Sequence, residues 1–294
     1  MREARVAAQA KINLRLKILA READGYHSIE TIFARTDLAD DVSIRVEISG
    51  RSRSIDCHGA DTGPAEQNLA YRAALAYEAA TGWPDSFAIE ITKRIPVGGG
   101  LGGGSADAGA VLRALDALSP RPLGPRIAML AAQLGSDVPF MTIESPVALA
   151  WSRGERLLSL PTLPWRPIVI VTPHTGIATS DAYTWVADSR FGFMPSAFVI
   201  ESGTVGDWAR MASIATNDFD GVVFARFPDL AAAAASLRKH GAMISMLAGS
   251  GSSVVGIFEQ QADAEKALAD APIKGLISHS AMSVAPVSID GAPK

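Results

Sequence analysis

The densest glycine cluster of the chain lies between Pro96 and Ser105, with the sequence Pro-Val-Gly-Gly-Gly-Leu-Gly-Gly-Gly-Ser. Glycine has no side chain to pack and loses much conformational entropy on folding, so this density disfavours a packed helix or strand. It suits a loop whose backbone must approach a ligand closely at positive φ. The pattern predicts a helix over 105–118, and the free N–H groups and dipole at a helix N-terminus attract anions. We therefore expect a phosphate-binding loop.

Three other interpretations of this loop are possible. One is a plain glycine-rich turn. A second is a dinucleotide-binding loop, because Gly98, Gly100 and Gly103 match G-x-G-x-x-G, but Pro96 interrupts the tight strand-to-loop entry that such a loop needs. The third, the P-loop G-x-x-x-x-G-K-[ST], is excluded because Ser105 stands where the lysine is required.

Two further segments carry polar residues that could do chemistry. Lys11 and Asn13 lie in an alternating apolar segment, and Asp137 lies in the turn Gly-Ser-Asp-Val-Pro. A second Gly/Ser-rich turn over 249–253 separates two apolar segments. Taken singly, each has a purely structural interpretation. Lys11 could be a solvated lysine on an edge strand, Asp137 an ordinary turn aspartate, and residues 249–253 a plain hairpin turn.

Taken together and in this order, the three segments resemble the three motifs of the GHMP kinases. The resemblance implies that the glycine-rich loop wraps the phosphates of ATP, that Asp137 is the catalytic base and that Lys11 contacts it. It also implies that the hydroxyl of Ser105 helps to hold Mg²⁺; the family often has a second serine next, where this chain has Ala106. The nucleotide-binding residues implied are Asn68, Lys93, Pro96, Val97, Gly98, Gly99, Gly100, Leu101, Gly102, Gly103, Gly104 and Ser105.

A fourth segment, Asp24-Gly25-Tyr26-His27 followed by Ile-Glu-Thr, is similar to one branch of this family, whose substrate is a cytidine diphosphate-linked methylerythritol. The chemistry is apt, because a tyrosine ring stacks on a flat base and a histidine can hydrogen-bond its edge. The resemblance implies ATP-dependent phosphorylation of the 2-hydroxyl of that alcohol. The substrate-binding residues implied are Asn13, Tyr26, His27, Asp137, Thr179, Gly249 and Ser250.

Rival functions remain open at this point. The nearest is another GHMP kinase of the homoserine or mevalonate type, which the Tyr26-His27 segment disfavours. A nucleotide-binding protein without catalysis is disfavoured by Lys11 and Asp137. A dinucleotide oxidoreductase is the most distant alternative.

The bulk properties fit a globular enzyme. The chain has 294 residues, 48% of them apolar and 20% charged, and a net charge of -4, which argues against nucleic acid or an anionic membrane as partner. Its single cysteine, Cys57, excludes an internal disulfide, and no Cys/His cluster suggests zinc. We find no signal peptide and no apolar run of membrane-spanning length. We expect a cytoplasmic protein that acts on a small molecule as a monomer or weak homodimer.

The order of predicted elements indicates an α+β fold. With the resemblance, this becomes a two-domain GHMP kinase fold with the active site in the interdomain cleft. A Pro-rich segment over 160–167 places the boundary between an ATP-binding domain, residues 1–158, and a C-terminal domain, residues 159–294. Apolar alternation predicts that Ile12, Leu14, Leu16 and Ile18 share one strand face. Residues 50–64 are expected to form a loop. Strands are predicted over 11–19, 30–34, 41–48, 86–91, 146–151, 166–172, 242–247, 253–258 and 278–284, and helices over 68–81, 105–118, 124–134, 180–187, 202–215, 229–239 and 262–269.

Overall fold

The computed structural model describes residues 2–22, 25–47, 50–174, 176–189, 200 and 205–290. Asp24 and part of the helix predicted over 202–215 lie outside the described residues. The larger sheet has the order β12-β1-β2-β4-β3; in addition, β5 pairs with β2, β6 pairs with β5, and the short β8 pairs with β1. Its strands are β1 (Arg2–Arg21), β2 (His27–Glu47), β3 (Arg53–His58), β4 (Ser86–Thr92), β5 (Val147–Ser152), β6 (Arg156–Ser159), β8 (Thr216–Asn217) and β12 (Ser288–Ile289).

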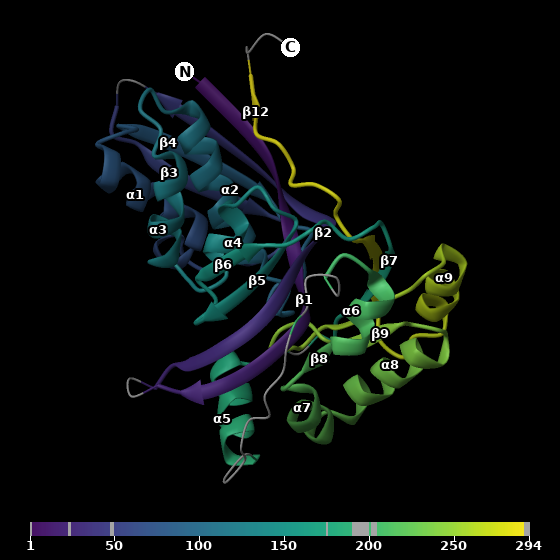
Figure 1. The fold of residues 1–294 in the computed structure, drawn as a ribbon. Helices are drawn as coiled ribbons and strands as arrows, with labels where there is room; N and C mark the ends of the chain where they lie inside the picture. The colour runs from purple at the N-terminus through teal and green to yellow at the C-terminus, as the bar shows by residue number, and fades with distance from the viewer. Residues whose placement is uncertain are drawn as a thin grey trace.

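Helices pack against the upper half of this sheet in Figure 1. They are α1 (Leu69–Thr81), α2 (Gly103–Leu118), α3 (Ile127–Ala132) and α4 (Val138–Thr142), with the 3₁₀ turns η1 (Ala65–Gln67) and η2 (Gly124–Arg126). Helix α1 begins where the Asn68 side chain accepts a hydrogen bond from the N–H of Ala70 at 2.9 Å. It ends at Gly82, whose φ of 71° suits glycine.

A second, four-stranded sheet lies in the lower half, in the order β11-β7-β10-β9. Its strands are β7 (Pro167–Val171), β9 (Ile244–Leu247), β10 (Val254–Ile257) and β11 (Gly275–His279). The helices of this half are α5 (Thr179–Ser189), α6 (Trp208–Ile214), α7 (Asp220–Arg226), α8 (Pro228–Lys239) and α9 (Gln261–Ala269).

The long ladder of β1 and β2 joins the two halves. The strands pair antiparallel from Arg2 opposite Val46 to Arg21 opposite His27. In Figure 1 they run from the top of the molecule to its lower part, where α5 lies beside them. Ile12 and Leu14 pack in the larger hydrophobic core, whereas Leu16 and Ile18 pack in the smaller core with the helices of the lower half.

The prediction that Leu16 shares a face with Ile12 and Leu14 is therefore wrong. The register of β1 against β2 shifts between Asn13 and Arg15. Such a bulge interrupts the alternation of faces, and alternation in the sequence alone does not reveal it. Leu16 consequently lines the same cavity as Lys11 and Asn13.

The outer edge of β1 is covered at three places. Strand β12 pairs with it at Ala4 and Arg5, and β8 pairs with it at Arg15 and Leu16. Between them, the N–H of Lys11 donates to the carbonyl of Leu101 at 3.0 Å. The glycine-rich loop thus docks against the edge of the central ladder.

Other differences from the predicted elements have local causes. The strands predicted over 30–34 and 41–48 are one strand, β2. The loop expected over 50–64 contains β3, which pairs parallel with β4, and α1 separates the two strands in sequence. The helix predicted over 124–134 is the 3₁₀ turn η2 followed by α3. The strand predicted over 278–284 is wrong, because the last long strand, β11, spans 275–279. Strands β6, β8 and β12 and helices α4 and α7 were not predicted.

Candidate active site

The glycine-rich loop leads directly into α2. Gly102 caps this helix in the left-handed conformation, with φ 73°, and no side chain caps the first turn. The first N–H groups of α2 therefore have no side-chain cap, and their binding of an anion remains a prediction. Loop residues 96–105 all line a cavity of about 340 Å³, together with Asn68 and Lys93.

The predicted third motif packs underneath this loop. A Cβ added to Gly100, at φ 77°, would lie 2.0 Å from the carbonyl oxygen of Ala248 and 2.8 Å from that of Gly251. One added to Gly99 would lie 2.4 Å from the hydroxyl of Ser253. The N–H of Ser253 also donates to the carbonyl of Gly99 at 3.2 Å. Gly100 is required because backbone from the two halves of the chain meets here, whereas the atom close to Gly99 belongs to a serine side chain.

A buried cluster of three charges joins the two ends of the loop. The ammonium of Lys93 lies 2.5 Å from a carboxylate oxygen of Asp40 and 2.6 Å from one of Asp107, and these side chains are 4%, 0% and 4% exposed. The other oxygen of Asp40 accepts from the N–H groups of Arg94 and Ile95, at 2.5 and 2.8 Å. Asp40 and Lys93 thus hold the start of the loop, and Lys93 ties it to α2 through Asp107.

The two carboxylates of this cluster compete for one ammonium. Burial raises the pKa of Asp107 to about 7, against the attraction of Lys93 and with the help of the charge on Asp40. Burial lowers the pKa of Lys93, but the two carboxylates outweigh it and the net shift is upward. Lys93 is thus an ammonium ion committed to two protein partners. The nucleotide contact predicted for Lys93 remains a prediction.

Lys11 and Asp137 form an ion pair beside the glycine-rich loop. The Lys11 ammonium lies 3.3 Å from a carboxylate oxygen of Asp137 and donates to the side-chain oxygen of Asn13 at 3.0 Å. Asn13 in turn donates to the hydroxyl of Thr31 at 2.8 Å. Lys11 is 4% exposed, whereas the Asp137 side chain is 30% exposed. The lysine is thus held in place by its neighbours, whereas the carboxylate is partly accessible to a ligand.

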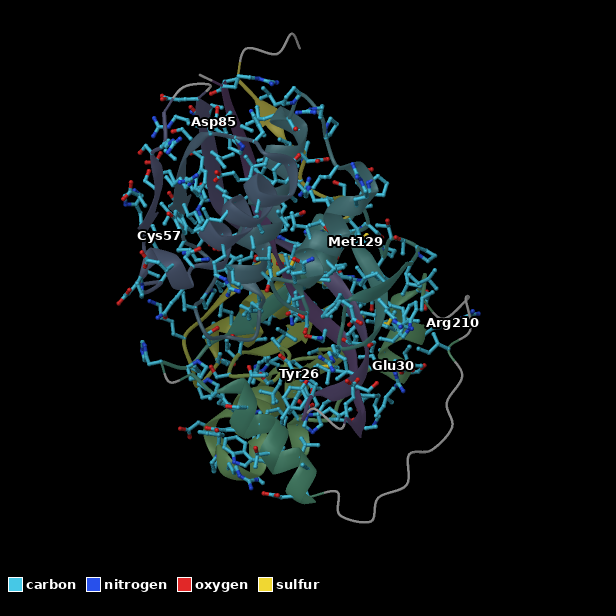
Figure 2. The ribbon with its side chains drawn as sticks, turned by 90° about the vertical axis from the view of Figure 1, so that its left-hand side faces the viewer. Tyr26, Glu30, Cys57, Asp85, Met129 and Arg210 are labelled. Atoms are coloured by element: carbon cyan, nitrogen blue, oxygen red, sulfur yellow. The ribbon has the colours of Figure 1, made fainter. Side chains whose placement is uncertain are left out.

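A second cavity, of about 910 Å³, opens on the other side of this pair. Tyr26 and His27 line it, as do Thr179 and Ser250, whose hydroxyls lie 3.1 Å apart. Figure 2 shows Tyr26 just above the green helices of the lower half. The predicted substrate residues Asn13, Asp137 and Gly249 line the same cavity.

The two cavities share three lining residues, Gly100, Gly102 and Ser105. Lys11 and Asp137 line the larger cavity at this junction. A group held by the loop would therefore face the Asp137 carboxylate. This arrangement suits transfer of a group from a ligand in one cavity to a ligand in the other.

Comparison with known proteins assigns the family. The model of the GHMP kinases N terminal domain matches residues 68–144, and that of the GHMP kinases C terminal domain matches residues 199–275. The 4-diphosphocytidyl-2-C-methyl-D-erythritol kinase of Solibacter usitatus is 38% identical over 267 residues, covering 88% of this chain and 83% of its own. That of Pelotomaculum thermopropionicum is 38% identical over 255 residues, covering 85% and 87%.

The chain belongs to the GHMP kinases, in the family of the 4-diphosphocytidyl-2-C-methyl-D-erythritol kinases. A solved 4-(cytidine 5'-diphospho)-2C-methyl-D-erythritol kinase superposes on it with a TM-score of 0.77 at 34% identity, covering 94% of this chain and 99% of that one. The homoserine kinase of Cytophaga hutchinsonii shares the fold at a TM-score of 0.70 and 18% identity, covering 98% and 97%. The predicted α+β GHMP kinase fold is confirmed. The domain boundary at 158/159 remains a prediction.

Several residues of this GHMP kinase site were not foreseen from the sequence. Tyr183 of α5 stacks on His27, with ring centroids 4.6 Å apart, and meets the edge of Phe219 at 5.0 Å. Burial and the charge of Asp137 raise the pKa of Tyr183 to about 12, so its phenol stays protonated. The side-chain amide of Asn217 holds the third motif through the carbonyls of Leu247 and Gly249, at 3.0 and 2.8 Å. No local pattern marks these residues, because their partners are distant in sequence.

Asn68 lies at the nucleotide side of this GHMP kinase. Besides capping α1, its side chain is 3.4 Å from the hydroxyl of Thr62 and 3.6 Å from the sulfur of Cys57. These residues also line a small adjoining cavity of about 200 Å³. Asn68 thus lies beside the phosphate loop, and its contact with a nucleotide remains a prediction.

The Mg²⁺ ion predicted from the family resemblance would have few protein ligands at this site. Within the described ranges, no group of three or more His, Cys, Asp or Glu side chains could hold a metal ion. Mg²⁺ with nucleotides usually takes one or two protein ligands, the rest being phosphate oxygens and water. Ser105, which lines both cavities, suits that limited part, and the binding of Mg²⁺ remains a prediction.

In the described part of the chain, no helix has the length and apolar character needed to cross a membrane. The cytoplasmic location and the monomeric or weakly dimeric state remain predictions for this GHMP kinase.

Proposed function

We propose that this kinase transfers the γ-phosphoryl group of ATP to the 2-hydroxyl of 4-diphosphocytidyl-2-C-methyl-D-erythritol. The observation that carries the proposal is the Lys11–Asp137 pair. This pair lines the larger cavity close to the residues that it shares with the cavity of the glycine-rich loop. The relatives named for this substrate, and the aromatic lining of the larger cavity, support the acceptor.

The chain's own groups suit phosphoryl transfer through a loose transition state, in which positioning and charge neutralisation supply most of the rate. Residues 98–105 would hold the β- and γ-phosphates at the N-terminus of α2. The hydroxyl of Ser105 would help to hold Mg²⁺, an ion that when bound neutralises phosphate charge. Asp137 would orient the acceptor hydroxyl and take its proton, and Lys11, 3.3 Å away, would keep the carboxylate aimed.

The larger cavity accounts for the choice of acceptor. The cytosine would lie against Tyr26 and His27, where the stacked Tyr183 extends the aromatic surface. Thr179 and Ser250 would contact the alcohol end near Asp137, together with Asn13 and Gly249. A small acceptor such as homoserine or mevalonate would leave the aromatic part of the cavity unused.

The test is a coupled ADP-release assay with Mg-ATP and three acceptors: 4-diphosphocytidyl-2-C-methyl-D-erythritol, homoserine and mevalonate. We expect turnover with the cytidylyl alcohol alone. Turnover with homoserine or mevalonate instead would keep the kinase chemistry and refute the acceptor. ADP release at the same rate with and without each acceptor would refute the proposed transfer.

A further inference from the structure

The turn between β5 and β6, residues 152–155, has a fixed and unusual backbone. Ser152 has φ 65°, the one non-glycine residue at positive φ in the described part of the chain, and Gly154 has φ 112°. Two hydrogen bonds hold the turn: the N–H of Arg153 donates to the carboxylate of Glu155 at 2.9 Å, and the N–H of Gly154 donates to the carbonyl of Trp151 at 3.2 Å. A non-glycine residue keeps this conformation only where its surroundings enforce it.

The turn directs the side chain of Arg153 at the hairpin that carries Tyr26. The guanidinium donates to the carboxylate of Glu22, with N–O distances of 3.0 and 2.5 Å. Its carbon lies 4.1 Å from the centre of the Tyr26 ring, within the range of a cation–π contact. Glu22 also closes the hairpin, because its N–H donates to the carbonyl of Tyr26 at 2.7 Å. Arg153 therefore holds both the ring and the residue that fixes the ring's backbone.

The same turn touches the segment that carries the candidate base. A Cβ added to Gly154 would lie 3.3 Å from the carbonyl oxygen of Ser136 and 3.5 Å from its Cβ. Ser136 immediately precedes Asp137, and Arg153, Tyr26, Ser136 and Asp137 all line the larger cavity. One short turn thus contacts both ends of the acceptor cavity.

We propose that Arg153 is a positioning residue for the acceptor, setting the Tyr26 ring at a fixed place relative to Asp137. The inference rests on the proposed function, since it assumes that a base binds against Tyr26. Tyr26 is 57% exposed, so the ring retains surface for a ligand while the guanidinium holds it. The Arg153–Glu22 pair is the means by which the β5–β6 turn selects acceptors with a flat base at the correct distance from the hydroxyl.

The experiment compares Arg153→Met with Arg156→Met, which removes an exposed arginine from the same β-hairpin. For each protein we would measure KM for 4-diphosphocytidyl-2-C-methyl-D-erythritol, KM for ATP, kcat, and the Kd of cytidine diphosphate by calorimetry. Arg153→Met should raise the acceptor KM and the cytidine diphosphate Kd about three- to tenfold, in line with a lost cation–π contact and a loosened ring. The KM for ATP and the melting temperature should stay near wild type, and Arg156→Met should change none of these.

Two further variants test the route of the effect. Arg153→Lys keeps the charge beside Glu22 but loses the planar stack, so it should recover part of the acceptor KM. Glu22→Gln in the Arg153→Met background should add little to the single change, because the two residues act as one unit.

The inference is overturned if Arg153→Met leaves the acceptor KM within 1.5-fold of wild type, or if it raises both KM values and lowers the melting temperature together. Failure of the proposed function would look different. In that case the wild-type enzyme itself would not phosphorylate the cytidylyl alcohol, whatever the variants do.

Discussion

Lys93→Met tests whether the buried Asp40–Lys93–Asp107 cluster holds the phosphate loop. The change removes the ammonium from between two carboxylates that are 0% and 4% exposed. Removing one partner of a buried ion pair typically costs about 3–5 kcal/mol of unfolding free energy, because the remaining charge is left without compensation. We expect a loss of that size at pH 8.5, together with a raised KM for ATP.

The loss should depend on pH, and the sign follows from Asp107. Its pKa in the folded protein is raised to about 7, so the wild-type carboxyl is ionised above that pH. Without Lys93 the pKa of Asp107 should rise further. Above pH 7, Asp107 then stays protonated in the folded variant, whereas it is ionised in the unfolded chain. The stability of the variant should then keep falling as pH rises above 7, by up to about 1.4 kcal/mol per pH unit relative to wild type. Below pH 6 the difference should be smallest.

The assay is urea unfolding followed by circular dichroism at pH 5.5, 7.0 and 8.5, with the m-value checked for constancy. Arg94→Met is the matched control, because Arg94 pairs with Asp41 on the surface, where both side chains are more than half exposed. Exposed pairs contribute about 0–1 kcal/mol. A loss below 1 kcal/mol for Lys93→Met at pH 8.5, or a loss that does not change with pH, would refute the role of the cluster.

Three other predictions concern the site itself. Asp137→Asn should lower kcat about 10²- to 10⁴-fold with an unchanged circular dichroism spectrum, and a variant within threefold of wild type would remove Asp137 from the role of base. Gly100→Ala should lower the free energy of unfolding by more than 2 kcal/mol and abolish turnover, because the added Cβ would lie 2.0 Å from the carbonyl oxygen of Ala248. Gly98→Ala is the control, since Gly98 has φ 74° but no atom within 4 Å of an added Cβ. This change should lower the free energy of urea unfolding by only about 1 kcal/mol. Tyr183→Ala should raise KM for the cytidylyl acceptor and leave KM for ATP unchanged; equal effects on both would contradict its place in the acceptor cavity.

The parts of the site that the sequence predicts are those encoded locally. The glycine-rich loop and the helices predicted over 68–81 and 105–118 each depend on residues within a few positions, and the structure has a loop and helices at these places. The proximity of Lys11 to Asp137 came from family resemblance, since 126 positions separate them in the chain.

The remaining parts depend on contacts that no local pattern encodes. Asp40 and Lys93 are 53 positions apart and look like ordinary polar residues of a strand and a loop. Strand β3 is short and largely exposed, and α1 separates it in sequence from β4, the strand with which it pairs. Leu16 changes side because of a bulge, and bulges leave no trace in apolar alternation.

The cover on the outer edge of β1 has a consequence for how the protein is made. Unpaired strand edges are templates for pairing with other chains. Residues 101, 216–217 and 288–289 close this edge, and ribosomes produce all of them after β1. A nascent chain that has completed residues 1–158 therefore still carries an edge open at Ala4 and at Arg15. A chain released at that length should therefore self-associate through this edge. Correct folding of the first half thus requires that the second half be synthesised soon after it.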